Sequence, residues 1–366
     1  SLHYRWLDRQ HNPVWINCRG DVILDEFNKP LYLIGCVNEI GKRQKADNIS
    51  GLLREPSLEE YVSSKSKNNI TGYFMQIGID DFDEINGRFG LKCGDEILKQ
   101  FSMCMQSCIN ENQKIYELGN GRFMIMDLAN HTKEDILELY DELKKSVEVA
   151  LEENAYRIVY TISVGIVEID KEMQDHDTLI KYSEFALNEA KKKGKNSCYF
   201  FTQDKYKQFI RRREIRVALQ NAVDHNFKNF DVYYQPIIDI HTRNLIGAEA
   251  LMRFKMKRNE QIEFISPAEF IPILEESGLI IPAGRWILRQ AVACCKKWQE
   301  FIPEFKVNVN LSYVQIIKSR ILDEIKQALK DYTLKPALLG IEVTESGYLE
   351  NTYHYKKLWS SLKEEG

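Results

Sequence analysis

Three oxygen-bearing side chains lie within apolar, strand-like segments in the second half of the chain: Glu249, Asn310 and Glu342. Glu249 stands between two alanines, and a carboxylate in such a setting is costly unless it is paired or bound to a metal. All three side chains are oxygen donors, which suits Mg²⁺ or Mn²⁺ better than zinc. The residue types therefore predict a divalent-cation site. The alternative is that internal arginine or lysine side chains pair with the two glutamates.

The alternation of side chains indicates which groups share a face, because successive residues of a strand point to opposite sides. In the segment 305–312, one face carries Lys306, Asn308, Asn310 and Ser312. In the segment 341–345, the polar face carries Glu342 and Thr344. We therefore expect strands with one polar and one apolar face.

The composition is typical of ordinary globular domains. The 366 residues are 44% hydrophobic and 28% charged, with a net charge of −4, and this length suggests roughly two or three domains. No apolar run approaches the roughly 20 residues that span a membrane, so we expect a cytoplasmic protein, with an upstream membrane anchor still allowed. The eight cysteines form no CxxC pair, which argues against zinc and disulfides. A mildly acidic chain without a long basic run argues against a nucleic acid polymer as partner.

The fold class that we predict is α/β multidomain, with four blocks. Residues 1–40 are too few for an independent core, residues 41–202 alternate strand-like and helical segments, residues 203–226 form a charged linker helix, and residues 227–366 contain the oxygen donors. In the second block we expect strands at 73–79, 115–118, 123–128 and 158–167, and helices at 95–109, 134–152 and 177–193. Three consecutive arginines at 211–213 are expected on a solvated face of the linker helix.

Residues 1–40 resemble the C-terminal hairpin of a PAS sensor domain. The resemblance rests on the strand around Trp15, on Arg19-Gly20 and on Leu33-Ile34-Gly35. We expect separate strands at 14–18, 20–24 and 31–37. The signal that such a domain would sense is not readable from this segment.

Motifs across residues 45–201 resemble GGDEF diguanylate cyclase domains. The segment 47–52 looks like the opening DxLTGL, and the segment 186–196 matches the closing ALYxAKxxGxN. The hairpin 116–123 stands where the signature RxGGDEF belongs. The resemblance implies an α/β cyclase-like domain.

The same comparison implies that the cyclase chemistry is lost. Joining two GTP molecules needs carboxylates that hold Mg²⁺. The family's first metal-binding aspartate is matched by Gly78, and its signature acidic residues by Gly121 and Arg122. The family's inhibitory RxxD site falls on Asn110 and Gln113. We therefore predict neither cyclic-di-GMP synthesis nor product inhibition at that site.

Four residues match nucleotide-contacting positions of the family. Asn86 and Asp95 match guanine contacts, and Lys191 and Lys195 match triphosphate contacts. One interpretation is a degenerate domain that binds GTP as a regulator. The other is structural, with Asn86 capping a turn, Asp95 serving as a helix N-cap and the lysines on a solvated helix end.

From residue 230 onward, five motifs in order resemble an EAL phosphodiesterase domain. They are YQPI at 234–237, EALMRF at 249–254, SP with FIP at 266–272, NVNLS at 308–312 and IEVTES at 341–346. The implied fold is a TIM-like barrel, in which the C-terminal ends of the strands form the active site. The polar groups of three strands would converge there.

The resemblance implies hydrolysis of one phosphodiester bond of cyclic-di-GMP, giving linear pGpG, by a water that Mg²⁺ or Mn²⁺ activates. The metal ligands would be Glu249, Asn310 and Glu342, and Glu249 would also be catalytic. The substrate contacts would be Gln235, Leu251 and Arg253, with the arginine at a phosphate. Glu345 would steady a loop close to the metal.

Residues 227–366 are too few for a complete barrel of roughly 250 residues, so we expect the N-terminal half of an EAL domain. The family's later aspartates and lysine would lie beyond it. We predict that residues 1–366 alone hydrolyse little cyclic-di-GMP, and that they aggregate, associate with a second copy or depend on further residues. The partner that we expect for the protein is a second copy, in a homodimer. The leading hypothesis is a phosphodiesterase regulated by the PAS-like and inactive cyclase-like parts. The alternative is a binding module in which both enzymatic domains are retired.

Overall fold

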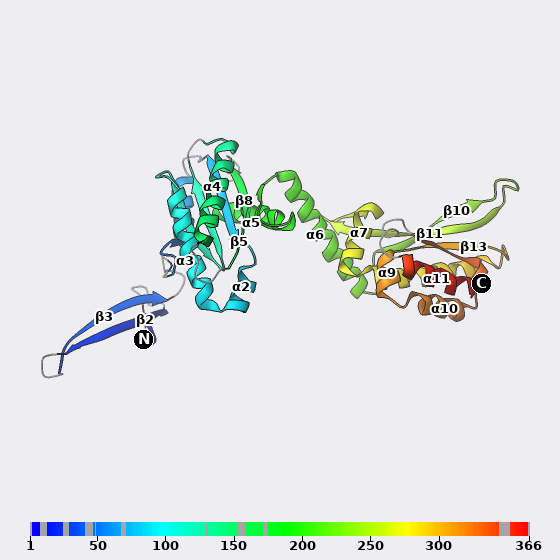
Figure 1. Ribbon diagram of the computed structural model, residues 1–366. Helices are drawn as coiled ribbons and strands as arrows, with labels where there is room; N and C mark the ends of the chain where they lie inside the picture. The colour runs from blue at the N-terminus through cyan, green and yellow to red at the C-terminus, as the bar shows by residue number, and fades with distance from the viewer. Residues whose placement is uncertain are drawn as a thin grey trace. The chain divides into compact units, whose positions relative to one another are not determined.

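The computed structural model describes residues 2–7, 13–24, 29–40, 47, 49–66, 71–128, 131–152, 158–170, 175–343 and 352–364. The chain divides into two compact units, Ser1–Tyr206 and Lys207–Gly366 (Figure 1). None of the helices within the described ranges is both long and apolar enough to span a membrane.

The first three strands form an antiparallel sheet in the order β1-β2-β3. They are β1 (Leu2–Leu7), β2 (Pro13–Leu24) and β3 (Pro30–Ile40). The predicted break near Arg19 is wrong, because β2 pairs with β3 without interruption through Arg19↔Cys36 and Gly20↔Gly35. Gly20, which suggested a turn, faces another glycine inside the ladder.

A six-stranded sheet with the order β4-β6-β7-β5-β8-β9 forms the framework of the rest of unit 1. Its strands are β4 (Leu53–Arg54), β5 (Gly72–Ile79), β6 (Gln113–Gly119), β7 (Arg122–Asp127), β8 (Ile162–Ile169) and β9 (Cys198–Phe200). Its helices are α1 (Glu55–Ser66), α2 (Phe82–Phe89), α3 (Leu91–Cys108), α4 (Lys133–Glu152) and α5 (His176–Lys192).

Both faces of this sheet are buried at β5, all eight residues of which are buried, including the polar Gln76. Met75 and Ile77 belong to one core cluster with residues of α3 and α4, whereas Phe74 belongs to a second cluster with Leu58 of α1 and Leu179 of α5. Helices therefore cover each side of the central strand.

The predicted elements of this block are present, with shifted ends. Helix α3 begins at Leu91 rather than Asp95, because Gly90 adopts a φ of 88° and lets the chain turn directly from α2 into α3. Strand β8 begins at Ile162 rather than at residue 158. Helices α1 and α2 were not predicted.

Helix α6 (Gln203–Asp224) spans the predicted range. Arg212 and Arg213 are exposed as predicted, but the prediction of a solvated face is wrong for Arg211. Arg211 is only 19% exposed and donates from Nη1 and Nη2 to Glu263 at 2.9 and 2.6 Å, and from Nε to Glu269 at 2.9 Å. Arg212 pairs with Glu276 at 2.5 Å. These carboxylates lie more than fifty residues further along the chain, so no local pattern indicated them.

Unit 2 contains a sheet with the order β10-β11-β13-β14, with β12 paired to β11. Its strands are β10 (Phe230–Ile238), β11 (Leu245–Arg258), β12 (Gln261–Ile265), β13 (Lys306–Leu311) and β14 (Leu339–Val343). Its helices are α7 (Pro267–Ser277), α8 (Ile280–Trp298), α9 (Tyr313–Lys318), α10 (Ile321–Tyr332), the short 3₁₀ helix η1 (Pro336–Leu338) and α11 (Thr352–Glu364).

The sheet of unit 2 has one buried face and one polar face. Ala248 and Ala250 of β11 and Val307 and Val309 of β13 are buried in a single core cluster with residues of α7, α8 and α10. The intervening side chains point away from that cluster, as the alternation predicted. The polar face is where the candidate site lies.

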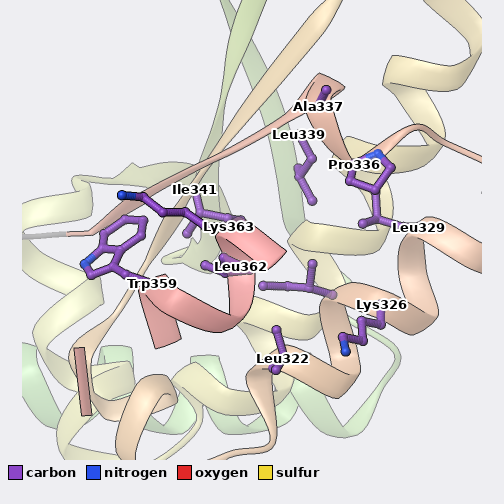
Figure 2. Close-up of a pocket in the computed structure, with 11 residues that line it drawn as sticks. Leu322, Lys326, Leu329, Pro336, Ala337, Leu339, Ile341, Trp359, Leu362 and Lys363 are labelled. Carbon is purple, nitrogen blue, oxygen red and sulfur yellow. The ribbon is translucent and has the colours of Figure 1, made fainter. Parts of the chain in front are cut away.

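An apolar groove of about 490 Å³ lies beside β14, the last strand in the sheet order (Figure 2). Leu322 and Leu329 of α10 form one wall, Leu339 and Ile341 of β14 another, and Trp359 of α11 a third. Strand β14 has a described partner on one side only, β13. The sheet of the described residues is therefore an open arc.

Candidate functional site

The strand register brings the predicted oxygen donors together on the polar face. Strands β11 and β13 are parallel, with Glu249 opposite Asn308. Strands β13 and β14 are also parallel, with Asn310 opposite Glu342. The four side chains thus occupy neighbouring positions on three adjacent strands, close to where β13 and β14 end.

Each glutamate is held by the amide of an asparagine. Asn310 donates from Nδ2 to Oε1 of Glu249 at 2.6 Å, and Asn308 donates from Nδ2 to Oε1 of Glu342 at 2.7 Å. Among the described residues, neither glutamate forms an ion pair with lysine or arginine. In the described part of the chain, no lysine or arginine therefore neutralises these two carboxylates, as the alternative interpretation would require.

The donor set fits part of the coordination shell of a hard divalent cation. Glu249 is half-buried and Glu342 and Asn310 are exposed, so their oxygens are accessible from the polar face. Within the described residues no three Asp, Glu, His or Cys side chains gather as a metal cluster. A cation here would depend on the amide oxygen of Asn310 beside the two carboxylates, a mixture that Mg²⁺ and Mn²⁺ accept.

Two of the predicted substrate contacts lie on the same face. Gln235 of β10 stands opposite Glu249 in the antiparallel pairing with β11. Arg253 is four residues further along β11; its guanidinium lies 5.5 Å from the centre of the Tyr233 ring, and Nη1 donates to the carbonyl of Met252 at 2.9 Å. The arginine is thus half-buried and oriented by its neighbours.

Leu251 shares that face and is half-buried between Glu249 and Arg253. Glu345 lies outside the described residues, so its predicted role stays a prediction. Asn308 was not among the predicted site residues, although its bond to Glu342 makes it part of the site. Its position on the polar face of β13 was the signal that could have identified it.

A small cavity of about 230 Å³ lies next to Asn310 and Arg253. Its walls combine apolar residues of α7 and α8 with the polar residues Glu275, Ser312 and Gln315. Ser312 donates from Oγ to Oε1 of Glu275 at 2.6 Å. The sequence did not indicate this contact, because the two residues lie 37 positions apart.

In unit 1, the turn between β6 and β7 carries no acidic side chain at the positions that would face a metal. Gly121 has a φ of 69°, and a Cβ on it would lie 2.7 Å from the ring of Phe82. Arg122 pairs with Glu184 at 3.2 Å. A Cβ on Gly78 would lie 3.1 Å from Nζ of Lys191. A lysine ammonium therefore stands beside the strand position where the resemblance expects a carboxylate.

The carboxylates that remain near this turn are already engaged. Asp80 is 4% exposed and accepts hydrogen bonds from Thr161 Oγ1 at 2.7 Å, Ser163 Oγ at 2.8 Å and the backbone N–H of Asn196 at 3.1 Å. Nζ of Lys195 donates hydrogen bonds to Oδ1 and Oδ2 of Asp81 at 2.7 and 2.8 Å. Protein donors thus occupy the oxygens that a cation would need.

The structural reading of the nucleotide-contact candidates needs correction. Asp95 is not an N-cap, because it lies one turn inside α3. Asn86 lies inside α2 rather than in a turn, and its Oδ1 occupies the space that a Cβ on Gly94 would fill. Lys195 is exposed just after α5, as that interpretation expected, and it also pairs with Asp81.

The two units match two families of known proteins. The family described as "Diguanylate cyclase, GGDEF domain" matches residues 45–197, and the family described as "EAL domain" matches residues 216–366. The chain is a GGDEF–EAL protein.

Relatives of this GGDEF–EAL chain are longer proteins. The "Signaling protein YkoW" of Bacillus subtilis is 30% identical over 303 residues, 81% of this chain and 36% of YkoW. The "Cyclic di-GMP phosphodiesterase PdeR" of Escherichia coli is 27% identical over 349 residues, 93% of this chain and 50% of PdeR. The chain thus spans about a third to a half of the length of these relatives.

Among solved structures, "Vibrio cholerae LapD S helix-GGDEF-EAL (bound to c-di-GMP)" aligns with 89% of this chain and 75% of its own. The TM-score is 0.40 and the sequence identity is 14%.

The GGDEF domain also contains a buried polar cluster at its opening motif. Asp47 accepts from the backbone N–H groups of Ile49 and Ser50 and pairs with Arg54 at 2.5 Å. Ser50 donates to the buried carboxyl of Glu117. Burial raises the pKa of Glu117 to about 7, with the Ser50 hydrogen bond and Arg54 acting in the opposite direction and the charge of Asp47 adding to the rise. Asp47 and Ser50 of the opening motif thus have structural roles, because both belong to this cluster.

Proposed function

We propose that the full-length protein hydrolyses cyclic-di-GMP to linear pGpG with the help of Mg²⁺ or Mn²⁺ at the polar face of β11, β13 and β14. The observation that carries the proposal is the convergence of Glu249, Asn310 and Glu342 on three adjacent strands, with Asn310 bonded to Glu249 at 2.6 Å and opposite Glu342 in the register. PdeR, a relative that matches this chain across both domains, is named a cyclic di-GMP phosphodiesterase, which supports the same chemistry.

The residues divide into two roles. Glu249, Asn310 and Glu342 would hold the cation, which supplies charge neutralisation and a water of lowered pKa when it is bound. Arg253 would hold a phosphate of the dinucleotide, since a guanidinium matches phosphate geometry, while Gln235 and Leu251 would contact the rest of the substrate. Glu345 would steady the segment after β14.

A hydrolysis assay on the full-length protein tests the proposal. Purified protein is incubated with cyclic-di-GMP and either Mg²⁺ or Mn²⁺, and pGpG is measured by chromatography. We expect turnover that needs the cation and is lost on chelation. Binding of cyclic-di-GMP without any turnover would favour the alternative, a binding module in which both enzymatic domains are retired.

A second function concerns the GGDEF domain, which we infer binds GTP as a regulator without making cyclic-di-GMP. The observation that favours it is the ammonium of Lys191 beside Gly78, where a positive charge could meet a phosphate without a metal. Asn86, Asp95 and Lys195 would supply the remaining contacts. Calorimetry with GTP in the presence of EDTA tests it, and a Lys191→Ala variant with unchanged GTP affinity would remove the assignment.

Three further parts of the proposal concern the whole protein. The first three strands would belong to a PAS-like sensor, the protein would act as a homodimer, and residues 1–366 alone would show little turnover. Light scattering of the full-length protein tests the second, and an assay of the 1–366 span tests the third.

A further inference from the structure

The residues directly after β13 are tied to two neighbouring helices. Ser312 is the N-cap of α9, and its Oγ accepts from the backbone N–H of Val314 at 3.2 Å. The same oxygen donates its proton to Oε1 of Glu275 on α7 at 2.6 Å. Ser312 is buried, and it lies two residues after Asn310.

Gln315 completes this arrangement from the other side. Its Oε1 accepts from the backbone N–H of Ser312 at 3.2 Å, which forms a capping box. The Gln315 side chain is 3% exposed and fills the space above Gly284 of α8, where a Cβ would lie 2.1 Å from Nε2. The absence of a side chain at Gly284 of α8 therefore leaves room for the amide of Gln315.

Capping alone does not account for Glu275. The N-terminus of α9 is already satisfied by Ser312 and Gln315, so a helix cap would be complete without a carboxylate from α7. The hydrogen bond to Glu275 fixes the orientation of the Ser312 hydroxyl. Hydrogen bonds to a carboxylate are among the stronger ones in proteins. Glu275 on α7 and Gln315 on α9 thus hold Ser312, two residues after Asn310.

We propose that Glu275, acting through Ser312, is a positioning residue for Asn310 at the cation site. The inference rests on the proposed function, because it assumes that Asn310 binds the cation. Asn310 is exposed at the end of β13, so its side chain has few packing contacts of its own to orient it. A fixed residue two positions further along limits how far the strand end moves. Residues that orient metal ligands typically contribute about 10- to 100-fold in metal affinity.

The test measures Mn²⁺ binding to the full-length protein by electron paramagnetic resonance, together with hydrolysis. We expect Glu275→Ala to weaken Mn²⁺ binding about 10-fold and to lower kcat at subsaturating Mn²⁺, with KM for cyclic-di-GMP unchanged. Glu275→Gln keeps an acceptor for Ser312 and should stay within about twofold of the wild type in Mn²⁺ affinity. Glu276→Ala is the matched control, because this neighbour on α7 points to Arg212 instead.

A second variant removes the other partner of the same contact. Ser312→Ala deletes the hydroxyl that donates to Glu275 and should weaken Mn²⁺ binding in the same direction, which keeps the test decisive if Glu275→Ala does not fold. Unchanged Mn²⁺ affinity in Glu275→Ala, or in Ser312→Ala where the first variant does not fold, overturns the positioning role as long as Glu249→Ala loses the ion. If Glu249→Ala also keeps it, the proposed cation site itself is wrong.

Discussion

The GGDEF domain and the EAL part of the chain each present carboxylates near the end of a central strand, but they use them differently. Asp80 of the GGDEF domain is buried and accepts three hydrogen bonds from protein donors. Glu249 of the EAL part is half-buried and accepts one, from Asn310. A carboxylate whose lone pairs are filled by the protein holds structure, whereas one with free lone pairs is open to a cation.

The residues beside Asp80 and beside Glu249 also differ, in their charge. Beside Asp80 stand Gly78, with Lys191 against it, and the Gly121-Arg122 turn. Beside Glu249 stand Asn308 and Asn310, which are neutral and present oxygen as well as N–H groups. The two places therefore differ in charge as well as in hydrogen bonding, with cationic side chains near Asp80 and neutral amides beside Glu249.

The largest effect that we expect is the loss of hydrolysis in Glu249→Ala of the full-length protein. Removing a metal ligand should lower kcat by about 1,000-fold, while the melting temperature without metal changes little, because the side chain is half-exposed. Glu260→Ala, in the β11–β12 turn, is the control. Wild-type turnover in Glu249→Ala would show that the metal does not depend on this carboxylate and would contradict the proposed difference between Glu249 and Asp80.

Asp80→Ala should show the reverse pattern. The free energy of unfolding of the GGDEF domain should fall by about 3 kcal/mol, because the hydroxyls of Thr161 and Ser163 lose a charged acceptor in a buried site. Mn²⁺ affinity should not change. Calorimetry and Mn²⁺ titration measure the two quantities, with the exposed Asp83→Ala as control. A weaker Mn²⁺ affinity in Asp80→Ala would mean that this carboxylate also serves a cation.

Gly121→Ala tests whether the GGDEF turn has room for any side chain. The backbone at Gly121 has a positive φ, and the added Cβ would lie 2.7 Å from the Phe82 ring. Together these two effects should lower the free energy of unfolding by about 2 kcal/mol. Gly119→Ala is the matched control: its φ is 83° but nothing lies within 4 Å of its Cβ, so about 1 kcal/mol is expected. Equal losses in the two variants would show that crowding by Phe82 plays no part.

A further expected effect is a pH dependence that belongs to the GGDEF domain alone. The pKa of Glu117 is raised from 4.5 to about 7 by burial, so the folded domain binds this proton more tightly than the unfolded chain does. Its contribution to stability is therefore complete below about pH 4.5 and is lost as the pH rises to about 7. Urea unfolding at several pH values should show this decline, and Glu117→Gln should flatten it.

The exposed Glu96→Gln is the control for that experiment. Asp47 acts in a different window, because Arg54 and two backbone N–H groups hold its pKa well below the usual range against the effect of burial. Its contribution is present above the ordinary aspartate pKa and is lost at strongly acidic pH. A Glu117→Gln variant with the wild-type pH profile would show that another group titrates.

Much of the site was predictable because its signal is local. A period of two assigned Asn310 and Glu342 to polar faces, and the structure confirms those faces. Glu249 was singled out by its place between two alanines, and the strand register brings it beside these faces. The register was not predictable in the same way, since it depends on how β11, β13 and β14 align across long connections. The same holds for Ser312 and Glu275, whose contact joins residues 37 positions apart.

The fold was predictable where elements are long and periodic. Helix α4 and strand β5 were placed to within one residue. The short helix α2 was missed because it follows directly on a left-handed Asp81 and is separated from α3 by a single glycine. Arg211 of α6 was misassigned because its charge suggested solvent, whereas Glu263 on β12 and Glu269 on α7 bind it.

The bond between Asn310 and Glu249 has one more consequence, which concerns exchange rather than affinity. The amide now presents Nδ2 to the glutamate, and an ion shared by the two residues needs an oxygen on that side. Ion entry is therefore coupled to a half-turn of the amide about its last side-chain bond. In amide NMR spectra, the Nδ2 proton of Asn310 that donates to Glu249 should lose its hydrogen-bonded shift when a diamagnetic Mg²⁺ binds, so this side chain would report occupancy of the site.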